Sequence, residues 1–226
     1  NTVDVGKFPD GLEPLSRYVR DLGMGFGIWF EPERAVKGTT ILNEHPEWFV
    51  PVDQPYYEPQ NYNIDMSISD AQDYVIEMIS GWVDRLDLSW IRWDYNINPD
   101  VLWSVVDPSH KLEFAYIQGL YRVLDTLISK YPSLMIDSCS SGGRRIDMGT
   151  IRRGHTFWIS DRSEDPMICR YMQARANRFL PGNLLNSAVV VNRNQGDEGF
   201  GDTSILSRML GALSFNGDIA SWSSKL

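Results

Sequence analysis

Apolar runs and amphipathic segments alternate along most of the chain. Short apolar runs, of the length typical of buried strands, are separated by segments whose apolar positions recur three or four residues apart, as in helices. The expected strands are residues 25–31, 88–94, 134–138, 156–160, 184–191 and 211–220. The expected helices are residues 11–22, 69–86, 113–130, 144–153, 164–179 and 203–210. This alternation predicts an α/β fold with a parallel sheet built from strand–helix units.

The number of units bears on the architecture. A closed (β/α)8 TIM barrel needs eight parallel strands, and the sequence shows six strand–helix units. Because the first expected strand already follows a helix, we expect residues 1–226 to form a single partial (β/α)8 catalytic domain that lacks its first two strands. The alternative is an open, doubly wound sheet. Residues 39–67, rich in Pro, Asn and Tyr, are expected to form a long, structured loop between a strand and a helix, and residues 95–111 are expected to form a second long loop.

Composition and charge exclude several classes of protein. The chain has 226 residues, 42% of them hydrophobic, and a formal net charge of −9. Nucleic-acid binding needs a basic surface that neutralises phosphates, and no run of Lys or Arg supplies one. No stretch of 18 apolar residues occurs, so no membrane span is predicted. We therefore expect a soluble protein; the compartment stays open, with the cytoplasm slightly favoured.

The first candidate for chemistry is the aspartate that closes the expected strand at residues 88–94. Trp90, Arg92 and Asp94 share one face of that strand, because side chains alternate along it. Barrel enzymes place catalytic groups at the carboxyl ends of strands, and Arg92 would favour the charged form of Asp94 there. The alternative is a structural ion pair between Arg92 and Asp94, since either charge is costly to bury alone.

The second candidate repeats this pattern two strands later, where Asp161 follows the apolar run that contains Trp158. Taken alone, Asp161 has the ordinary alternative role of a helix N-cap. As a pair, two carboxylates at the same rim of a barrel are what glycoside hydrolysis requires. Other acidic residues near strand ends compete for these roles, namely Glu31, Glu33 and Asp137.

A turn of small residues, Cys-Ser-Ser-Gly-Gly at 139–143, lies between an expected strand and helix. Small residues let the backbone approach a ligand, although a tight turn with no such role is an equal alternative. The ending of a phosphate-binding loop is absent. His155 lies near a strand start, the wrong end to serve Cys139 in a catalytic triad. The three histidines are scattered, so neither a metal site nor a cofactor is predicted.

Six segments resemble, in order and spacing, motifs of the family 36 glycoside hydrolases, the melibiase-type α-galactosidases. They are residues 7–12 (KFPDGL), 27–33 (GIWFEPE), 45–48 (HPEW), 92–96 (RWDYN), 137–147 (DSCSSGGRRID) and 158–161 (WISD). One such motif would be weak, whereas six in order are specific. Beyond about residue 165 the resemblance thins.

The resemblance implies a (β/α)8 barrel and a retaining α-glycosidase that releases terminal α-D-galactose by double displacement. By matching of motifs, Asp94 falls on the family's nucleophile and Asp161 on its acid/base. Arg92 takes the place of a sugar-binding lysine. Three further positions fall on residues that line the sugar subsite, namely Cys139, Gly142 and Trp158. The partner implied is a carbohydrate substrate. Whether the full-length protein is a monomer or a homo-oligomer is left open.

Three departures from the family pattern bear on the sugar that is bound. Arg92 replaces the usual lysine, and a planar guanidinium does not hold the same hydroxyls as an ammonium group. The family's arginine before residues 64–65 is absent, because residues 59–61 are Pro, Gln and Asn. The acidic pair and the tryptophans that hold the galactose C4 and C6 hydroxyls lie upstream of residue 1 in the family.

Other functions therefore stay open beside the leading one. The same scaffold suits an α-N-acetylgalactosaminidase, another α-glycosidase or a transglycosylase. A carbohydrate-binding relative without activity is a further alternative, against which both aspartates argue. The last alternative is an unrelated barrel enzyme in which Arg92 and Asp94 form a structural ion pair.

Overall fold

The computed structural model describes residues 2–52, 60–98, 102–103, 106–162, 165–190, 201–218 and 220. The chain divides into two compact units, residues Asn1–Ile136 and Asp137–Leu226. Hydrogen bonding places the parallel strands in the order β1-β5-β6-β7-β8-β9. The boundary falls within β6 (Met135–Ser138).

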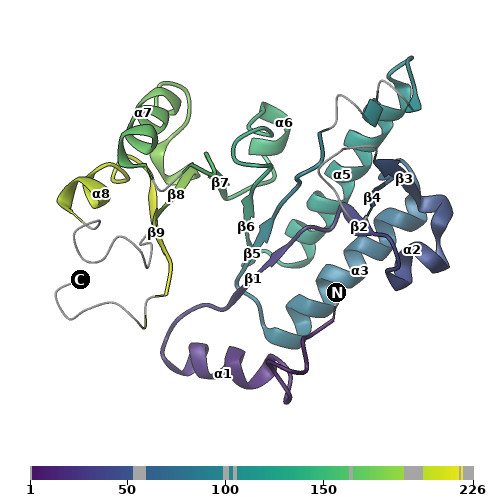
Figure 1. The fold of residues 1–226 in the computed structure, drawn as a ribbon, viewed down its shortest axis with the longest axis horizontal. Coiled ribbons are helices and arrows are strands. Elements are labelled where there is room, and N and C mark those ends of the chain that lie inside the picture. The colour runs from purple at the N-terminus through teal and green to yellow at the C-terminus, as the bar shows by residue number, and fades with distance from the viewer. Residues whose placement is uncertain are drawn as a thin grey trace. The chain divides into compact units, whose positions relative to one another are not determined.

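The first unit contains a parallel strand pair, a small antiparallel sheet and two long helices (Figure 1). Its helices are α1 (Glu13–Asp21), α2 (Thr40–Glu44), the 3-10 helix η1 (Pro46–Trp48), α3 (Ser69–Leu86) and α5 (Lys111–Lys130). Its strands are β1 (Gly27–Phe30), β2 (Arg34–Val36), β3 (Phe49–Val52), β4 (Asn61–Ile64), β5 (Trp90–Trp93) and the start of β6. Strands β1 and β5 pair in parallel, and β2, β4 and β3 form a separate antiparallel sheet in that order.

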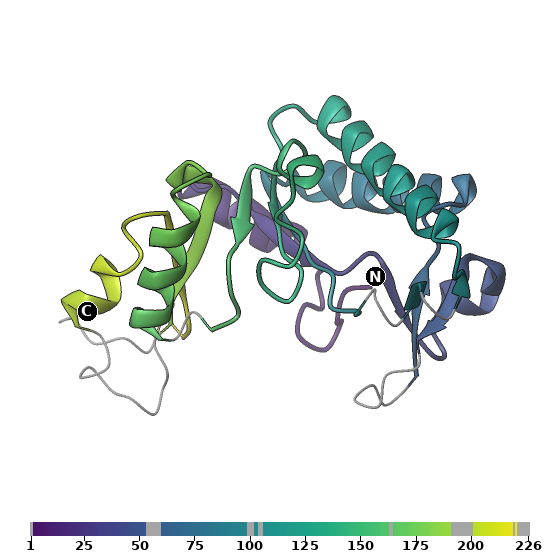
Figure 2. The ribbon, with the colours of Figure 1, turned by 90° about the horizontal axis from the view of Figure 1, so that it is seen from above.

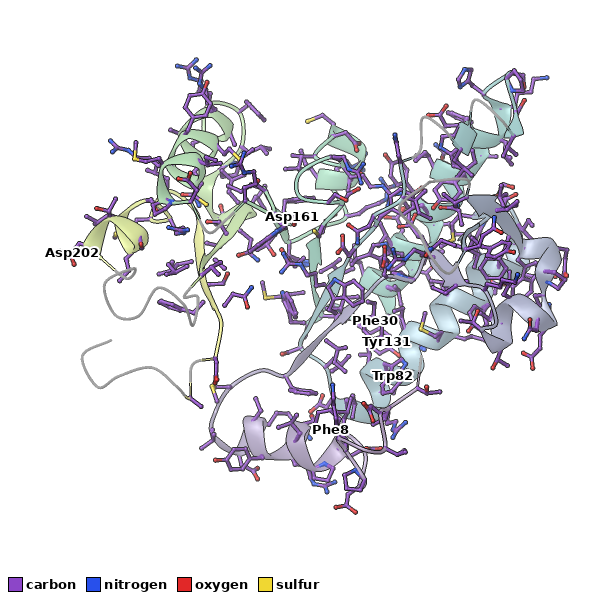
Figure 3. All side chains as sticks on the ribbon, viewed as in Figure 1. Phe8, Phe30, Trp82, Tyr131, Asp161 and Asp202 are labelled. Atoms are coloured by element: carbon purple, nitrogen blue, oxygen red, sulfur yellow. The ribbon has the colours of Figure 1, made fainter. Side chains whose placement is uncertain are left out.

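Helices α3 and α5 lie side by side in both views of the fold (Figures 1 and 2). The buried positions of α3 recur every three or four residues, from Ala71 to Leu86, so one face of the helix enters the core. In α5, Gly119 allows a close approach, because a Cβ there would lie 1.7 Å from the carbonyl oxygen of Met66. Phe30 of β1 packs against Trp82 of α3, with ring centroids 6.5 Å apart (Figure 3).

The second unit continues the same strand–helix alternation. It contains the end of β6, α6 (Met148–Ile151), β7 (Thr156–Trp158), α7 (Pro166–Ala176), η2 (Gly182–Leu184), β8 (Leu185–Val190), α8 (Asp202–Leu206) and β9 (Ala212–Asn216). Every strand pair from β6 to β9 is parallel. Asp147 and Asp165 accept hydrogen bonds from the first backbone N–H groups of α6 and α7, which is the usual way a helix starts.

A line of polar side chains crosses the strands of the second unit. Asp137 Oδ1 accepts hydrogen bonds from Thr156 Oγ1 at 2.7 Å and from Asn186 Nδ2 at 3.1 Å. Asn186 in turn accepts one from the hydroxyl of Ser214 at 3.2 Å. Asp137 is fully buried. Of the competing acidic residues, Asp137 thus belongs to a network that joins neighbouring strands.

The predicted parallel α/β fold is confirmed, and all six expected strands are present in part or whole. Residues 39–67, expected to form a long structured loop, lie between β1 and α3 and contain α2, η1, β3 and β4, which were not predicted individually. Four-residue strands interrupted by Pro and Asn show too few alternations to be distinguished from a loop. That the chain is one partial barrel without its first two strands stays a prediction. Among the described helices, none has the length and apolar character needed to cross a bilayer.

Candidate active site

Asp94 is held firmly at the carboxyl end of β5. Its backbone N–H donates to the carbonyl oxygen of Phe30 at 2.9 Å, which continues the pairing of β1 with β5. Its Oδ2 accepts a hydrogen bond from Trp29 Nε1 at 3.1 Å, and its Oδ1 accepts one from the backbone N–H of Tyr95 at 2.8 Å. The residue is 8% exposed. Donors to both oxygens fix the direction of the carboxylate.

Glu31 lies at the exit of β1, close to Asp94. Its Oε1 accepts a hydrogen bond from the backbone N–H of Asn96 at 3.1 Å, and its Oε2 forms an ion pair with Arg34. Burial raises the pKa of Glu31, and the charge of Asp94 adds to that rise, whereas Arg34 opposes it. With Trp29 and Arg34, Glu31 lines a cavity of about 320 Å³ in the first unit. Glu31, one of the competing carboxylates, therefore holds the backbone of Asn96 in the segment that follows Asp94.

Glu33, the other competitor on this segment, is fully buried. Its Oε1 accepts a hydrogen bond from Trp93 Nε1 at 2.7 Å, and its Oε2 accepts one from the hydroxyl of Tyr116. A carboxylate without access to solvent cannot contact a substrate. Glu33 therefore contacts other side chains of the core and is not a candidate for direct contact with a ligand.

Arg92 lies on β5 two residues before Asp94, opposite Trp29 in the β1–β5 register, and is partly buried. The sequence predicted a strand at residues 88–94, and Arg92 lies on it. Its role in binding sugar stays a prediction.

In the second unit, Asp161 follows β7 and is exposed (Figure 3). Its Oδ1 accepts a hydrogen bond from Trp158 Nε1 at 2.9 Å. The alternative role of Asp161 as a helix N-cap is wrong, because α7 begins at Pro166 and Asp165 caps it. Pro166, which follows Asp165 directly, is the sequence signal that could have distinguished the two aspartates, because Pro favours the first position of a helix.

The turn at residues 139–143 packs closely against Asp161. Gly142 has a φ of +86°, and a Cβ there would lie 3.0 Å from Ser160 Cα and 3.3 Å from Asp161 N. Cys139 is buried and packs with Trp158 in a small apolar cluster. The structure thus brings four of the predicted site residues together in the second unit: Cys139, Gly142, Trp158 and Asp161.

Two residues near Asp94 were missed by sequence reasoning, Trp29 and Tyr95. Trp29 shares a strand face with Gly27 and precedes the run of acidic residues, which is the signal that could have identified it. It is half exposed, so the ring beyond its Nε1 is open to a ligand. No three described His, Cys, Asp or Glu residues are grouped as metal ligands; that the reaction needs no metal stays a prediction.

The family model described as Melibiase matches residues 2–223, almost the whole chain. The chain belongs to the Melibiase family. It is 35% identical over 167 residues to the α-galactosidase AgaA of Geobacillus stearothermophilus, covering 72% of this chain and 23% of that protein. It is 30% identical over 193 residues to an α-galactosidase of Escherichia coli, covering 83% of this chain and 26% of that protein. The chain thus spans about a quarter of the length of these curated relatives.

Solved structures of the family agree with the fold of this Melibiase chain. The α-galactosidase of Lactobacillus brevis superposes with a TM-score of 0.85 at 28% identity, over 99% of this chain and 31% of that one. The AgaA enzyme of G. stearothermophilus superposes with a TM-score of 0.82 at 29% identity, over 96% of this chain and 31% of that one. The chain therefore has the fold of part of a family 36 α-galactosidase, which is consistent with a partial TIM barrel.

Proposed function

We propose that this Melibiase chain is part of the catalytic barrel of a retaining α-glycoside hydrolase that releases terminal α-D-galactose. The observation that carries the proposal is Asp94, a carboxylate held at the end of a parallel strand by donors to both oxygens. Barrel enzymes place catalytic groups at such positions. The relatives named above are α-galactosidases, and AgaA variants have been solved with stachyose and raffinose.

The mechanism assigns one role to each aspartate. Asp161 protonates the glycosidic oxygen while Asp94 attacks the anomeric carbon, so the leaving sugar departs and a glycosyl–enzyme ester forms. Asp161, now ionised, takes a proton from water, and that water displaces Asp94 from the anomeric carbon. Two inversions leave the configuration of the released sugar unchanged. The exposure of Asp161 supports this exchange of protons with water.

The hydrogen bonds around Asp94 suit a nucleophile. Trp29 Nε1 and the backbone N–H of Tyr95 stabilise the carboxylate and restrict its rotation, so that one oxygen is aimed at the substrate. Trp158 does the same for Asp161, because its Nε1 donates to Oδ1 of that carboxylate.

The sugar-binding residues are part of the same proposal. Arg92 lies beside Asp94 on β5, whereas Cys139, Gly142 and Trp158 gather near Asp161. Arg92, in the place of the family's lysine, offers a planar set of donors to the sugar hydroxyls. The α-N-acetylgalactosaminides are therefore the first alternative substrates to test.

The test is hydrolysis of p-nitrophenyl α-D-galactoside by the full-length protein and by its Asp94→Ala and Asp161→Ala variants, with and without azide. We expect turnover by the wild type and loss of turnover in both variants. Azide should give the β-galactosyl azide with Asp94→Ala, because it attacks the substrate directly, and the α-galactosyl azide with Asp161→Ala, because it attacks the glycosyl–enzyme.

The matched control is Asp202→Asn, which changes an exposed carboxylate in the first turn of α8. It should retain wild-type turnover. A folded wild-type protein that hydrolyses neither the galactoside nor an N-acetylgalactosaminide would contradict the proposal and favour another sugar or a binding protein.

A further inference from the structure

The buried carboxylate of Glu33 joins three elements of the first unit. It follows β1, its Oε1 accepts a hydrogen bond from Trp93 Nε1 at the end of β5, and its Oε2 accepts one from Tyr116 Oη on α5. A buried charge is costly unless it is hydrogen-bonded, and hydrogen bonds to a carboxylate are among the stronger ones. The bond from Trp93 Nε1 therefore holds the indole of Trp93 in one place.

The position of the Trp93 indole bears directly on Asp94, the next residue of the chain. Trp93 is 3% exposed and packs in the core of the unit. Trp93 and Asp94 share a peptide unit, so a displacement of the buried indole that moves the Trp93 Cα also shifts the peptide that directs Asp94. A shift of about 1 Å in a reacting group can cost about 10²-fold in rate.

The segment around Glu33 holds the neighbours of Asp94 as well. The carbonyl oxygen of Phe30 accepts from Asp94 N at 2.9 Å, and Glu31 accepts from Asn96 N at 3.1 Å. The carbonyl oxygen of Glu33 accepts from Ile64 N at 3.0 Å, which ties the segment to the small antiparallel sheet. Residues 30–33 thus contact Asp94 and the residues on both sides of it, and Glu33 does so as a fully buried carboxylate.

We infer that Glu33 is a positioning residue for the reaction: through the Trp93 indole it fixes the direction of the Asp94 carboxylate. The inference rests on the proposed role of Asp94 as the nucleophile. Glu33 acts on the transition state and not on binding, because it has no access to the substrate.

The experiment measures kcat and KM for p-nitrophenyl α-D-galactoside in the full-length protein and four single variants. Glu33→Ala removes the acceptor, and we expect kcat to fall about 10²-fold while KM changes less than about threefold. Glu33→Gln keeps an oxygen for the indole and should recover kcat to within about tenfold of wild type. Trp93→Phe removes the donor and should lower kcat about tenfold.

Tyr116→Phe is the matched control, because it breaks the other contact of the same carboxylate without touching the neighbour of Asp94. We expect its kcat to stay within about threefold of wild type. The double variant Glu33→Ala/Trp93→Phe should be no slower than Glu33→Ala alone, since both changes break one interaction.

Thermal unfolding of each variant separates the positioning role from a loss of fold. If Glu33→Ala melts below the assay temperature, Glu33→Gln and Trp93→Phe decide the question. The inference is overturned if folded Glu33→Ala or Trp93→Phe keeps wild-type kcat. It is also overturned if Tyr116→Phe loses as much kcat as Trp93→Phe, or if the losses in the double variant multiply.

A failure of the proposed function is recognised separately. Asp94→Ala, assayed with azide, tests whether Asp94 is the nucleophile at all. If Asp94→Ala gives β-galactosyl azide and the Glu33 and Trp93 variants behave as wild type, only the positioning role fails.

Discussion

The surroundings of Asp94 in the first unit and of Asp161 in the second differ in ways that match their proposed roles. Asp94 is 8% exposed, and three hydrogen bonds fix its backbone and both carboxylate oxygens. Asp161 is exposed, and its Oδ1 accepts a hydrogen bond from the side chain of Trp158. A nucleophile must stay charged and aimed, whereas an acid/base must gain and lose a proton in each cycle. Asp94 is therefore the aspartate that is held rigidly, and Asp161 is the one that has access to water.

The strongest way to break this comparison is to remove each carboxylate in turn. Asp94→Ala should lower kcat by about 10⁴-fold or more, because no other group supplies the covalent step. Asp161→Ala should cost about 10² to 10⁴-fold. The loss for Asp161→Ala should shrink on aryl galactosides with better leaving groups, which need less protonation. A rate for Asp94→Ala that depends on the leaving group in the same way would contradict the division of roles.

The second prediction concerns the turn that supports Asp161. Gly142→Ala places a Cβ 3.0 Å from Ser160 Cα at a φ of +86°, so the backbone of Asp161 must shift. We expect kcat for the galactoside to fall about 10²-fold. Gly38→Ala is the control, because Gly38 has a φ of +90° with nothing within 4 Å of the added Cβ. Equal losses of activity in the two variants would show that backbone strain, and not displacement of Asp161, is the cause.

The third prediction compares the two tryptophans that donate to the aspartates. Trp29→Phe removes a donor to Asp94 and should lower kcat about tenfold, since a hydrogen bond to a charged group is lost. Trp158→Phe removes the donor to Asp161 and should lower kcat more for galactosides with poor leaving groups than for those with good ones, because a misdirected acid/base protonates the leaving group less well. Steady-state kinetics on both kinds of galactoside measures the two effects. The comparison is wrong if Trp29→Phe shows this dependence on the leaving group and Trp158→Phe does not.

The smallest expected effect is on stability and concerns Glu31. Burial raises the pKa of Glu31 above its ordinary value of 4.5. Its contribution to the free energy of unfolding is therefore complete below that value and is lost as pH rises through the raised pKa. Gln does not titrate. The free energy of unfolding of Glu31→Gln should therefore rise relative to that of the wild type as pH increases from 4.5 through the raised pKa of Glu31. Guanidinium unfolding at a series of pH values, followed by tryptophan fluorescence, measures the difference.

Asp107 provides the control of opposite sign. Hydrogen bonds from Ser109 and from the backbone N–H of Leu112 lower the pKa of Asp107 to about 2. Its contribution is complete above its ordinary value of 3.8 and is lost as pH falls toward about 2. Asp107→Asn should therefore differ most from wild type above pH 3.8. Glu31→Gln and Asp107→Asn changing in the same direction with pH would contradict both assignments.

Much of the fold could be predicted from periodicity, because the long helices carry the signal many times. The expected helix at residues 69–86 coincides with α3, and the one at 113–130 begins two residues later than α5. Strands β2, β3 and β4 were missed, since three or four residues show too little alternation. Helix starts were harder to place, which is why Asp161 was weighed as a cap although Asp165 has that role.

In the candidate site too, some residues could be predicted from local sequence patterns and others could not. Asp94 and Asp161 could be identified from their places after apolar runs, because a parallel strand delivers its last side chain to one edge of the sheet. Their partners could not. Trp29 and Glu33 lie 65 and 60 residues from the groups they bond, and no local pattern encodes that pairing.

By itself the sequence determined the order of strands and helices, the family motifs and the two aspartates at strand ends, because these depend on spacing along the chain. Only the tertiary structure decided which acidic residues are support and which are candidates for chemistry. Glu31, Glu33 and Asp137 resemble Asp94 in sequence, yet each accepts hydrogen bonds that tie segments of the fold together, and Glu33 and Asp137 are fully buried. Burial and hydrogen-bond partners set what a carboxylate can do, and both arise from segments far apart in the chain.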